Sequence, residues 1–318
     1  MKAIYCSQYG APEELDLREV EKLKPKGEQV LVKIKATAIN DYDWSMVRGK
    51  PILYRLLFGL KKPKNPIPGM ECSGVVEEVG SAVSTFKKGD FVFGDTSNYE
   101  FGTFAEYCCL NQKALNLKPD FLSHEEAAAI PHAGLLAWQS FFELGKLKKG
   151  EKVLINGGGG GVGALAVQIA KAMNCEVHGV DTGEKLSLMK SWGFDQVFDY
   201  KNTDFTRNNL QYDFILDCKS NRFASAYKKV LTQKGRYISV GGKLFKLMCL
   251  ALVGKFSSKK RFYVLSLKSN QDLDTLLAFM QKHQIKPIIE GPFQLKDTPK
   301  QISRFGAGKH FGKIMICP

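Results

Sequence analysis

The chain has 318 residues, of which 44% are apolar and 25% are charged, a composition typical of globular proteins large enough for two domain cores. Its formal net charge is +14. Because no nucleic-acid-binding module is recognisable, we expect a basic solvated surface that attracts phosphorylated ligands, and no nucleic-acid partner. No apolar run reaches about 18 residues and no signal-peptide core follows Met1, so we expect neither a membrane span nor a secretory signal.

Strand-like patterns dominate residues 1–120. These patterns lie in three stretches that glycines and prolines separate: residues 29–38, 74–80 and 90–94. Near Asp120 the pattern changes, since Ser123 to Glu126 is typical of a helix N-terminus and an apolar helical stretch follows to Gly145.

From Glu151 onward, strand and helix patterns alternate, which predicts an α/β fold with a doubly wound parallel sheet. The predicted strands after the glycine run cover residues 175–180, 196–200, 212–217, 235–240 and 261–267. The predicted helices of this part cover 162–173, 184–192 and 222–231. Two further helices, 271–282 and 298–304, precede a final strand, 313–317. We therefore expect three parts: residues 1–120, residues 121–267, and residues 268–318, which return to the first part.

A run of five glycines, 157–161, separates an apolar strand from the helix at 162–173. Gly158, Gly160 and Gly163 match G-x-G-x-x-G, whose glycines allow a tight turn, close approach of a pyrophosphate, and helix–strand packing. Asp181 follows Gly163 by 18 residues, close to the spacing of about 20 for a ribose-binding carboxylate. This stretch predicts a Rossmann dinucleotide-binding unit.

Several further motifs accompany the glycine run: Pro68 to Val76, Lys88 to Gly94, Gly102 to Tyr107 and Glu126 to Trp138. With them the whole chain resembles the medium-chain dehydrogenase/reductase superfamily. The resemblance implies a β-rich GroES-like catalytic domain, an active site in the cleft beside the nucleotide domain, and a homodimer with its contact at 261–267.

The eight cysteines form no C-x-x-C pair, which is typical of reduced thiols in a cytoplasmic protein.

The assignment of the chain to a branch of the superfamily depends on the absence of zinc ligands. Zinc alcohol dehydrogenases carry Gly-His-Glu where this chain has Gly69-Met70-Glu71, and the loop 38–44 lacks their ligand cysteine. A thioether is a poor zinc ligand beside imidazole. The chain therefore resembles the zinc-free quinone-oxidoreductase branch, and we expect no zinc.

The expected cofactor is NADPH, with NADH still possible. The predicted cofactor-binding residues are Gly158, Gly159, Gly160, Gly161, Val162, Asp181, Thr182, Lys185, Tyr200, Val240, Gly241 and Gly242. Asp181 favours NADH because a carboxylate repels a 2′-phosphate, whereas Thr182, Lys185 and Tyr200 match phosphate-binding positions of the branch.

Without a metal, hydride transfer suits an acceptor that is already electron-poor, so we expect an enzyme that reduces a quinone or an α,β-unsaturated carbonyl. The predicted catalytic residues are Asn40 and Tyr42, although Asn40 equally suits a turn-capping role. His132 has two interpretations, a satisfied core histidine and a residue bordering the nicotinamide. The alternatives for function are an alcohol or aldehyde oxidoreductase and a non-catalytic NADPH-binding protein.

Residues 244–253 form an apolar stretch among lysines that include Lys243, Lys246, Lys259 and Lys260. We interpret it as a wall of the substrate cleft or a subunit contact. The alternative is weak contact with an anionic membrane surface.

Overall fold

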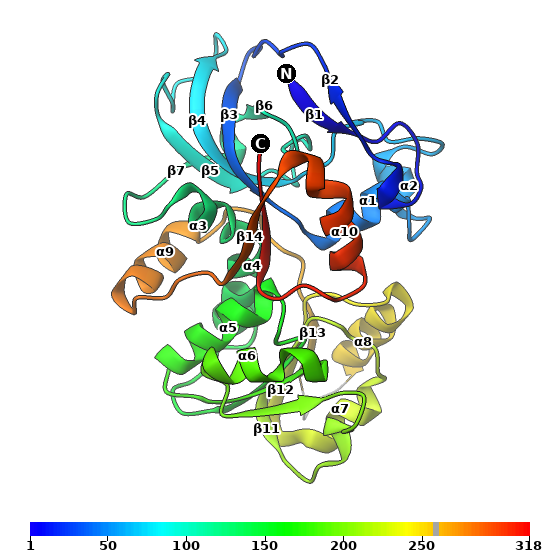
Figure 1. The fold of residues 1–318 in the computed structure, drawn as a ribbon. Helices are drawn as coiled ribbons and strands as arrows, with labels where there is room; N and C mark the ends of the chain where they lie inside the picture. The colour runs from blue at the N-terminus through cyan, green and yellow to red at the C-terminus, as the bar shows by residue number, and fades with distance from the viewer. Residues whose placement is uncertain (257–260) are drawn as a thin grey trace. The chain divides into compact units, whose positions relative to one another are not determined.

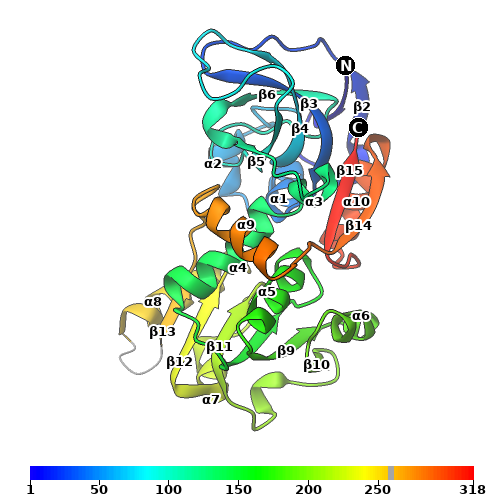
Figure 2. The same cartoon turned by 90° about the vertical axis from the view of Figure 1, so that its left-hand side faces the viewer.

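The computed structural model describes residues 1–256 and 261–318, which divide into two units (Figures 1 and 2). The first unit comprises Met1–His132, Ser269–Gln271 and Ile289–Pro318, and the second comprises Ala133–Lys268 and Asp272–Ile288. The expected domain limits, after residues 120 and 267, do not coincide with these bounds, and the domain assignment itself stays a prediction.

A parallel sheet organises the second unit. Its described strands lie in the order β10-β9-β8-β11-β12-β13, which is the doubly wound order of dinucleotide-binding folds. Their bounds are β8 Lys152–Asn156, β9 Glu176–Asp181, β10 Gln196–Asp199, β11 Tyr212–Asp217, β12 Leu231–Ser239 and β13 Arg261–Val264. The α/β fold class is thereby confirmed. β13 lies at the edge of this sheet, and the homodimer contact expected there stays a prediction.

The helices of the second unit follow the predicted alternation. Their bounds are α5 Gly161–Ala172, α6 Leu186–Ser191, α7 Ala224–Val230, α8 Leu244–Phe256 and α9 Leu273–Lys282, and α4, Pro131–Trp138, begins in the first unit. A 3-10 turn, Gly183–Lys185, replaces the first turn of the helix predicted from residue 184. Only the spacing of apolar residues was visible in the sequence, and it does not distinguish a 3-10 turn from an α-helical one.

Helix α8 is the apolar stretch for which the sequence predicted no element. Leu250 is buried, whereas Phe245, Met248 and Leu252 form an exposed stripe at helical spacing. Lys259 and Lys260, expected beside it, lie outside the described residues. The cleft wall, the subunit contact and the membrane-surface contact all stay predictions.

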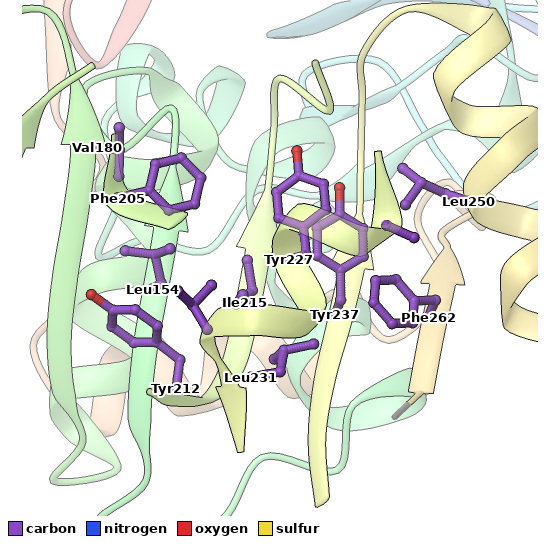
Figure 3. Close-up of a cluster of buried hydrophobic side chains, with 12 residues drawn as sticks. Leu154, Val180, Phe205, Tyr212, Ile215, Tyr227, Leu231, Tyr237, Leu250 and Phe262 are labelled. Atoms are coloured by element: carbon purple, nitrogen blue, oxygen red, sulfur yellow. The ribbon is translucent and has the colours of Figure 1, made fainter. Parts of the chain in front are cut away.

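The sheet of the second unit packs on a buried cluster rich in aromatic rings (Figure 3). The rings of Tyr227 and Tyr237 lie 4.4 Å apart between their centroids. The hydroxyl of Tyr237 donates a hydrogen bond of 2.8 Å to the buried carboxylate of Asp217. This core thus ends in polar groups at the carboxyl edge of the sheet.

The first unit is β-rich, as predicted. Its main sheet follows the order β14-β15-β3-β4-β5-β7, with β6 also paired to β3, and a separate pair is formed by β1 and β2. The bounds are β1 Lys2–Tyr5, β2 Asp16–Glu19, β3 Gln29–Ala38, β4 Glu71–Val79, β5 Phe91–Asp95, β6 Tyr107–Asn111, β7 Asn116–Leu117, β14 Ile289–Gln294 and β15 Lys313–Cys317. The tail therefore returns to the sheet of the front residues.

Short helices complete the first unit. They are α1 Asp41–Arg48, α2 Tyr54–Phe58, α3 His124–Ala128 and α10 Thr298–Gly306. α10 lies beside β15 and contacts α1 (Figure 2). Within the described ranges, no helix combines the length and the apolar character that crossing a bilayer requires.

We predict that Tyr237→Phe destabilises the second unit by about 1–3 kcal/mol, because it removes the hydroxyl that pairs with the buried Asp217 carboxylate. Tyr212→Phe is the matched control: its ring is equally buried, but its hydroxyl contacts a neutral partner, His178, at 3.1 Å. Chemical denaturation should show the larger loss for Tyr237→Phe. Equal losses of unfolding free energy in the two variants would show that the hydrogen bond to the Asp217 carboxylate adds no extra stability.

Candidate functional site

The glycine run forms the turn between β8 and α5. Gly157 has a φ of +88°, a conformation that favours glycine. A Cβ atom at Gly163 would lie 2.5 Å from the Cα atom of Gly158, so Gly163 must be glycine for the helix to pack on the turn. A Cβ atom at Gly158 would instead meet the side chain of Met189, at 2.7 Å. The first N–H groups of α5 have no partner within the helix and suit a pyrophosphate. The residues predicted to bind it all lie here: Gly158, Gly159, Gly160, Gly161 and Val162.

Asp181 ends β9, and its buried carboxylate faces this turn. Oδ2 accepts a hydrogen bond of 2.9 Å from the N–H of Gly159, and Oδ1 accepts one of 2.8 Å from the N–H of Thr182. The ammonium of Lys185 lies 3.4 Å from Oδ1. The carboxylate therefore holds the glycine turn, and its charge is balanced by Lys185. This reduces the repulsion that it exerts on a phosphate nearby.

The other residues predicted to select the cofactor gather around the end of β9. Asp199 on β10 pairs in register with Asp181, and the N–H of Tyr200 donates to the carbonyl of Asp181 at 3.1 Å. Tyr200 is exposed, whereas Lys185 is buried. The structure thus brings Thr182, Lys185 and Tyr200 together, and their binding roles stay predictions.

Val240, Gly241 and Gly242 lie against the loop that follows β11. The N–H of Val240 donates to the carbonyl of Asp217 at 3.0 Å. Gly242 has a φ of +143°, and a Cβ atom there would lie 2.5 Å from the Cβ atom of Ser220. The loop and the glycine turn both follow carboxyl ends of parallel strands, the edge where ligands bind in such sheets.

Asp217 is a residue of this edge that sequence reasoning missed. Its Oδ1 accepts hydrogen bonds from Asn156 Nδ2 at 2.8 Å and from the N–H groups of Lys219 and Ser220 at 2.9 and 2.8 Å. It therefore fixes the loop against which residues 240–242 pack. The available signal was its position at the end of a predicted strand, which it shares with Asp181.

In the first unit, the buried carboxylate of Glu71 joins four segments of the chain. Oε2 lies 2.8 Å from the ammonium of Lys313 and accepts a hydrogen bond of 3.0 Å from Asn40 Nδ2. Oε1 accepts one of 2.6 Å from the backbone N–H of His132. Lys313 also donates to Asn40 Oδ1. The side chain of Asn40 is thus held between two charged groups.

His132 is buried between two carboxylates. Its Nδ1 lies 2.8 Å from Asp95 Oδ2, and its Nε2 lies 3.5 Å from Asp41 Oδ1. Burial alone would lower the pKa of His132, but both carboxylates outweigh burial and raise it to about 10. Similarly, burial would raise the pKa of Asp95, and the pairing with His132 outweighs burial and lowers it. His132 is therefore an imidazolium at neutral pH.

Asp43 anchors the start of α1. Its buried carboxylate accepts hydrogen bonds from the N–H of Asn40 at 2.8 Å and from the N–H of Gly69 at 3.1 Å. Burial raises the pKa of Asp43 to about 7, against these hydrogen bonds. The contacts fix the N-terminus of α1, where Asn40 and Tyr42 lie, to the segment that precedes β4.

Tyr42 packs in a cluster of rings. Its centroid lies 6.1 Å from that of Tyr54, 6.4 Å from Phe58 and 6.2 Å from His132. Burial, helped by the nearby charge of Asp41, raises the pKa of Tyr42 to about 12. The phenol therefore stays protonated and can donate a hydrogen bond. The two predicted catalytic residues thus belong to adjoining clusters, and their roles stay predictions.

Met70, which stands at the position of the zinc-binding histidine, is fully buried. Among the residues that the structure describes, no group of three or more His, Cys, Asp or Glu side chains is arranged to hold a metal ion. The expectation of a zinc-free protein rests on the side chains at Met70 and at 38–44, and it stays a prediction.

Sequence reasoning did not identify Glu71, Asp95 or Lys313 as site residues. Glu71 directly follows Met70 in a recognised motif, and Lys313 opens an otherwise apolar strand. These were the available signals. No local sequence pattern indicates that Glu71 and Lys313, which are far apart in the chain, form an ion pair.

Two known families match separate parts of the chain. The family described as "Alcohol dehydrogenase GroES-like domain" matches residues 26–120, and the one described as "Zinc-binding dehydrogenase" matches residues 192–316. The chain is 32% identical to 2-methylene-furan-3-one reductase of Solanum lycopersicum, over 100% of this chain and 79% of the relative. It is 30% identical to the chloroplastic NADPH-dependent alkenal/one oxidoreductase of Arabidopsis thaliana, over 100% of this chain and 80% of the relative.

A solved structure is also similar over its full length. The quinone oxidoreductase from Coxiella burnetii superposes with a TM-score of 0.87 at 26% sequence identity, covering 100% of this chain and 99% of that one.

We predict that Asp95→Asn destabilises the first unit by about 3–5 kcal/mol at pH 6 and by less as the pH rises. The pKa of His132 is about 10 in the fold against an ordinary 6.5. The ion pair therefore stabilises fully below pH 6.5, and this contribution is lost as the pH approaches 10. Denaturation of both proteins between pH 6 and 9.5 measures the difference.

Glu28→Gln is the control for this prediction. It breaks the exposed pair with Lys113, so it should change stability little and equally over the same range. A difference between wild type and Asp95→Asn that does not vary with pH would show that His132 is neutral.

Proposed function

Because the chain belongs to the medium-chain dehydrogenase/reductase superfamily, in its quinone oxidoreductase-like branch, we propose that it is an NADPH-dependent reductase of quinones or α,β-unsaturated carbonyl compounds. The relatives from Solanum lycopersicum and Arabidopsis thaliana are by name a furanone reductase and an alkenal/one oxidoreductase, which supports the conjugated acceptor. The observation that carries the proposal is the ring cluster of Tyr42 beside the imidazolium of His132.

The glycine turn and the end of β9 would hold the dinucleotide. The N–H groups at the start of α5 bind the pyrophosphate, and Thr182, Lys185 and Tyr200 bind the 2′-phosphate. Since the carboxylate of Asp181 is already bonded to Gly159, Thr182 and Lys185, it does not compete for the ribose hydroxyls. This orientation supports NADPH over NADH.

When bound, a reduced nicotinamide dinucleotide supplies a hydride. An acceptor that takes up a hydride develops negative charge on its oxygen, and a hydrogen-bond donor stabilises that charge. The phenol of Tyr42 is such a donor, because it stays protonated at neutral pH. The ring centroid of His132 lies 6.2 Å from that of Tyr42, and the carboxylates of Asp95 and Asp41 offset its charge, so Tyr42 remains the main donor.

The neighbouring rings suit a planar acceptor. Tyr54 stacks on Tyr42, and Phe58 contacts both rings edge to face. Phe101 extends the cluster, with its centroid 5.4 Å from that of Phe58. Aromatic side chains bind flat conjugated molecules through large apolar faces, so the cluster favours quinones and enones over small aliphatic alcohols.

We predict that Lys185→Ala raises the Kd of NADPH at least ten-fold and leaves that of NADH nearly unchanged, because only NADPH carries the 2′-phosphate. Titration of the fluorescence of each reduced cofactor measures both constants. Lys190→Ala, at an exposed lysine of α6, the helix that follows Lys185, is the control. An equal loss for both cofactors would assign Lys185 a purely structural role.

We further predict that the wild-type protein oxidises NADPH with quinones and enones, and that Tyr42→Phe lowers kcat/KM about 10- to 100-fold without changing the Kd of NADPH. Tyr54→Phe, which keeps the same ring stack, should lower kcat/KM much less. A panel of quinones, enones and simple alcohols, run with reduced or oxidised cofactor, measures the activity.

Each alternative function has its own result in that panel. Oxidation of simple alcohols with NADP⁺ would indicate an alcohol oxidoreductase. Tight NADPH binding without turnover on any acceptor would indicate a non-catalytic protein. Equal activity of Tyr42→Phe and Tyr54→Phe would remove Tyr42 as the donor.

A further inference from the structure

A cavity in the first unit is lined by none of the rings that cluster around Tyr42. Its volume is about 710 Å³, within the range of small-molecule sites. α1, α10 and the segment before β2 line it, and its side chains include Arg48, Lys50, Arg55 and Glu13. Nothing in the proposed reductase function uses these residues.

Two arginines of this cavity are held in place by aromatic rings. The guanidinium of Arg48 lies 4.1 Å from the ring centroid of Trp44, and that of Arg55 lies 4.7 Å from the ring centroid of Tyr9. Arg55 Nε also donates to the carbonyl of Gly49 at 3.1 Å. A guanidinium held in this way loses little freedom when it binds an oxyanion.

The rings are themselves fixed. The hydroxyl of Tyr9 donates to the carbonyl of Gly59 at 2.6 Å. A Cβ atom at Gly306 would lie 2.4 Å from the ring of Trp44, so the backbone of α10 supports the indole directly. The cavity is therefore built before any ligand arrives.

The charges of the cavity are unbalanced. Within the described part of the chain, Arg48, Lys50 and Arg55 form no ion pair with a carboxylate. Glu13 accepts a hydrogen bond from the hydroxyl of Ser303, which lowers the pKa of Glu13 and keeps it ionised. The carboxylate of Glu14 also borders the cavity, because it accepts a hydrogen bond from the N–H of Ala11. Three positive groups against two carboxylates leave an excess of positive charge, which favours an anion.

We infer that this cavity is a binding site for an organic phosphate monoester. The phosphate dianion meets Arg48 and Arg55, which bind phosphate through paired N–H groups. The size of the cavity leaves room for a planar organic group, which stacks on the outer face of a guanidinium. Inorganic phosphate shares the first interaction and lacks the second, so it should bind more weakly.

The test is calorimetric titration with phenyl phosphate, inorganic phosphate and benzyl alcohol. Phenyl phosphate should bind, inorganic phosphate more weakly, and benzyl alcohol not at all. The double variant Arg48→Gln with Arg55→Gln should bind phenyl phosphate at least ten-fold more weakly than the wild type. Because that variant removes two ring contacts, Lys50→Gln is tested as well: its side chain is exposed, and its loss should weaken binding about three-fold.

Arg18→Gln is the matched control, since Arg18 also stacks on a tyrosine of the first unit, at 4.5 Å from Tyr5, but does not line the cavity. Its affinity should equal that of the wild type. The inference is overturned if phenyl phosphate does not bind, if the cavity variants bind it as well as Arg18→Gln does, or if NADPH displaces it, which would place the phosphate at the glycine turn.

Discussion

The buried carboxylate of Glu71 is the constraint on which the first unit depends. It meets Lys313 from the tail, Asn40 at the N-terminus of α1 and the backbone of His132 at the start of α4. Removing an ionised carboxylate from water costs several kcal/mol unless each oxygen is paired, so these segments must converge for the unit to fold. The tail strand β15 is thereby required in the sheet of the front residues. The same convergence fixes the start of α1, which carries Tyr42.

The second unit uses carboxylates in a similar way, at the ends of strands. Asp181 bonds the glycine turn, and Asp217 bonds the loop that supports residues 240–242. Both carboxylates accept hydrogen bonds from backbone N–H groups of these loops. Those N–H groups are thereby paired inside the protein and do not depend on water. The loops are therefore shaped before a cofactor arrives, and the N–H groups at the start of α5 are left for the phosphates.

Features encoded by local spacing were predictable from the sequence, whereas features that depend on distant contacts were not. The G-x-G-x-x-G spacing, the strand 212–217 and the helix after the glycines are local patterns, and the structure confirms them. The pairing of Asn40 with Lys313 spans 273 positions, and no periodicity reveals it. The direction of the Asp181 carboxylate was equally hidden, because it depends on a loop whose path is set by glycines. His132 looked like a core residue, and its charge depends on Asp95 from another strand.

The way these charges are balanced supports the proposed preference for conjugated acceptors. The ammonium of Lys313 lies against Glu71, and the imidazolium of His132 lies between Asp95 and Asp41, so the carboxylates offset both cations. A simple ketone concentrates the developing charge on one oxygen and gains more from a strong Lewis acid there. A quinone or enone spreads the charge over conjugated atoms, so a neutral phenol such as Tyr42 is a sufficient donor. The proposed preference for these acceptors is thus consistent with cations that stabilise the fold more than they polarise a substrate.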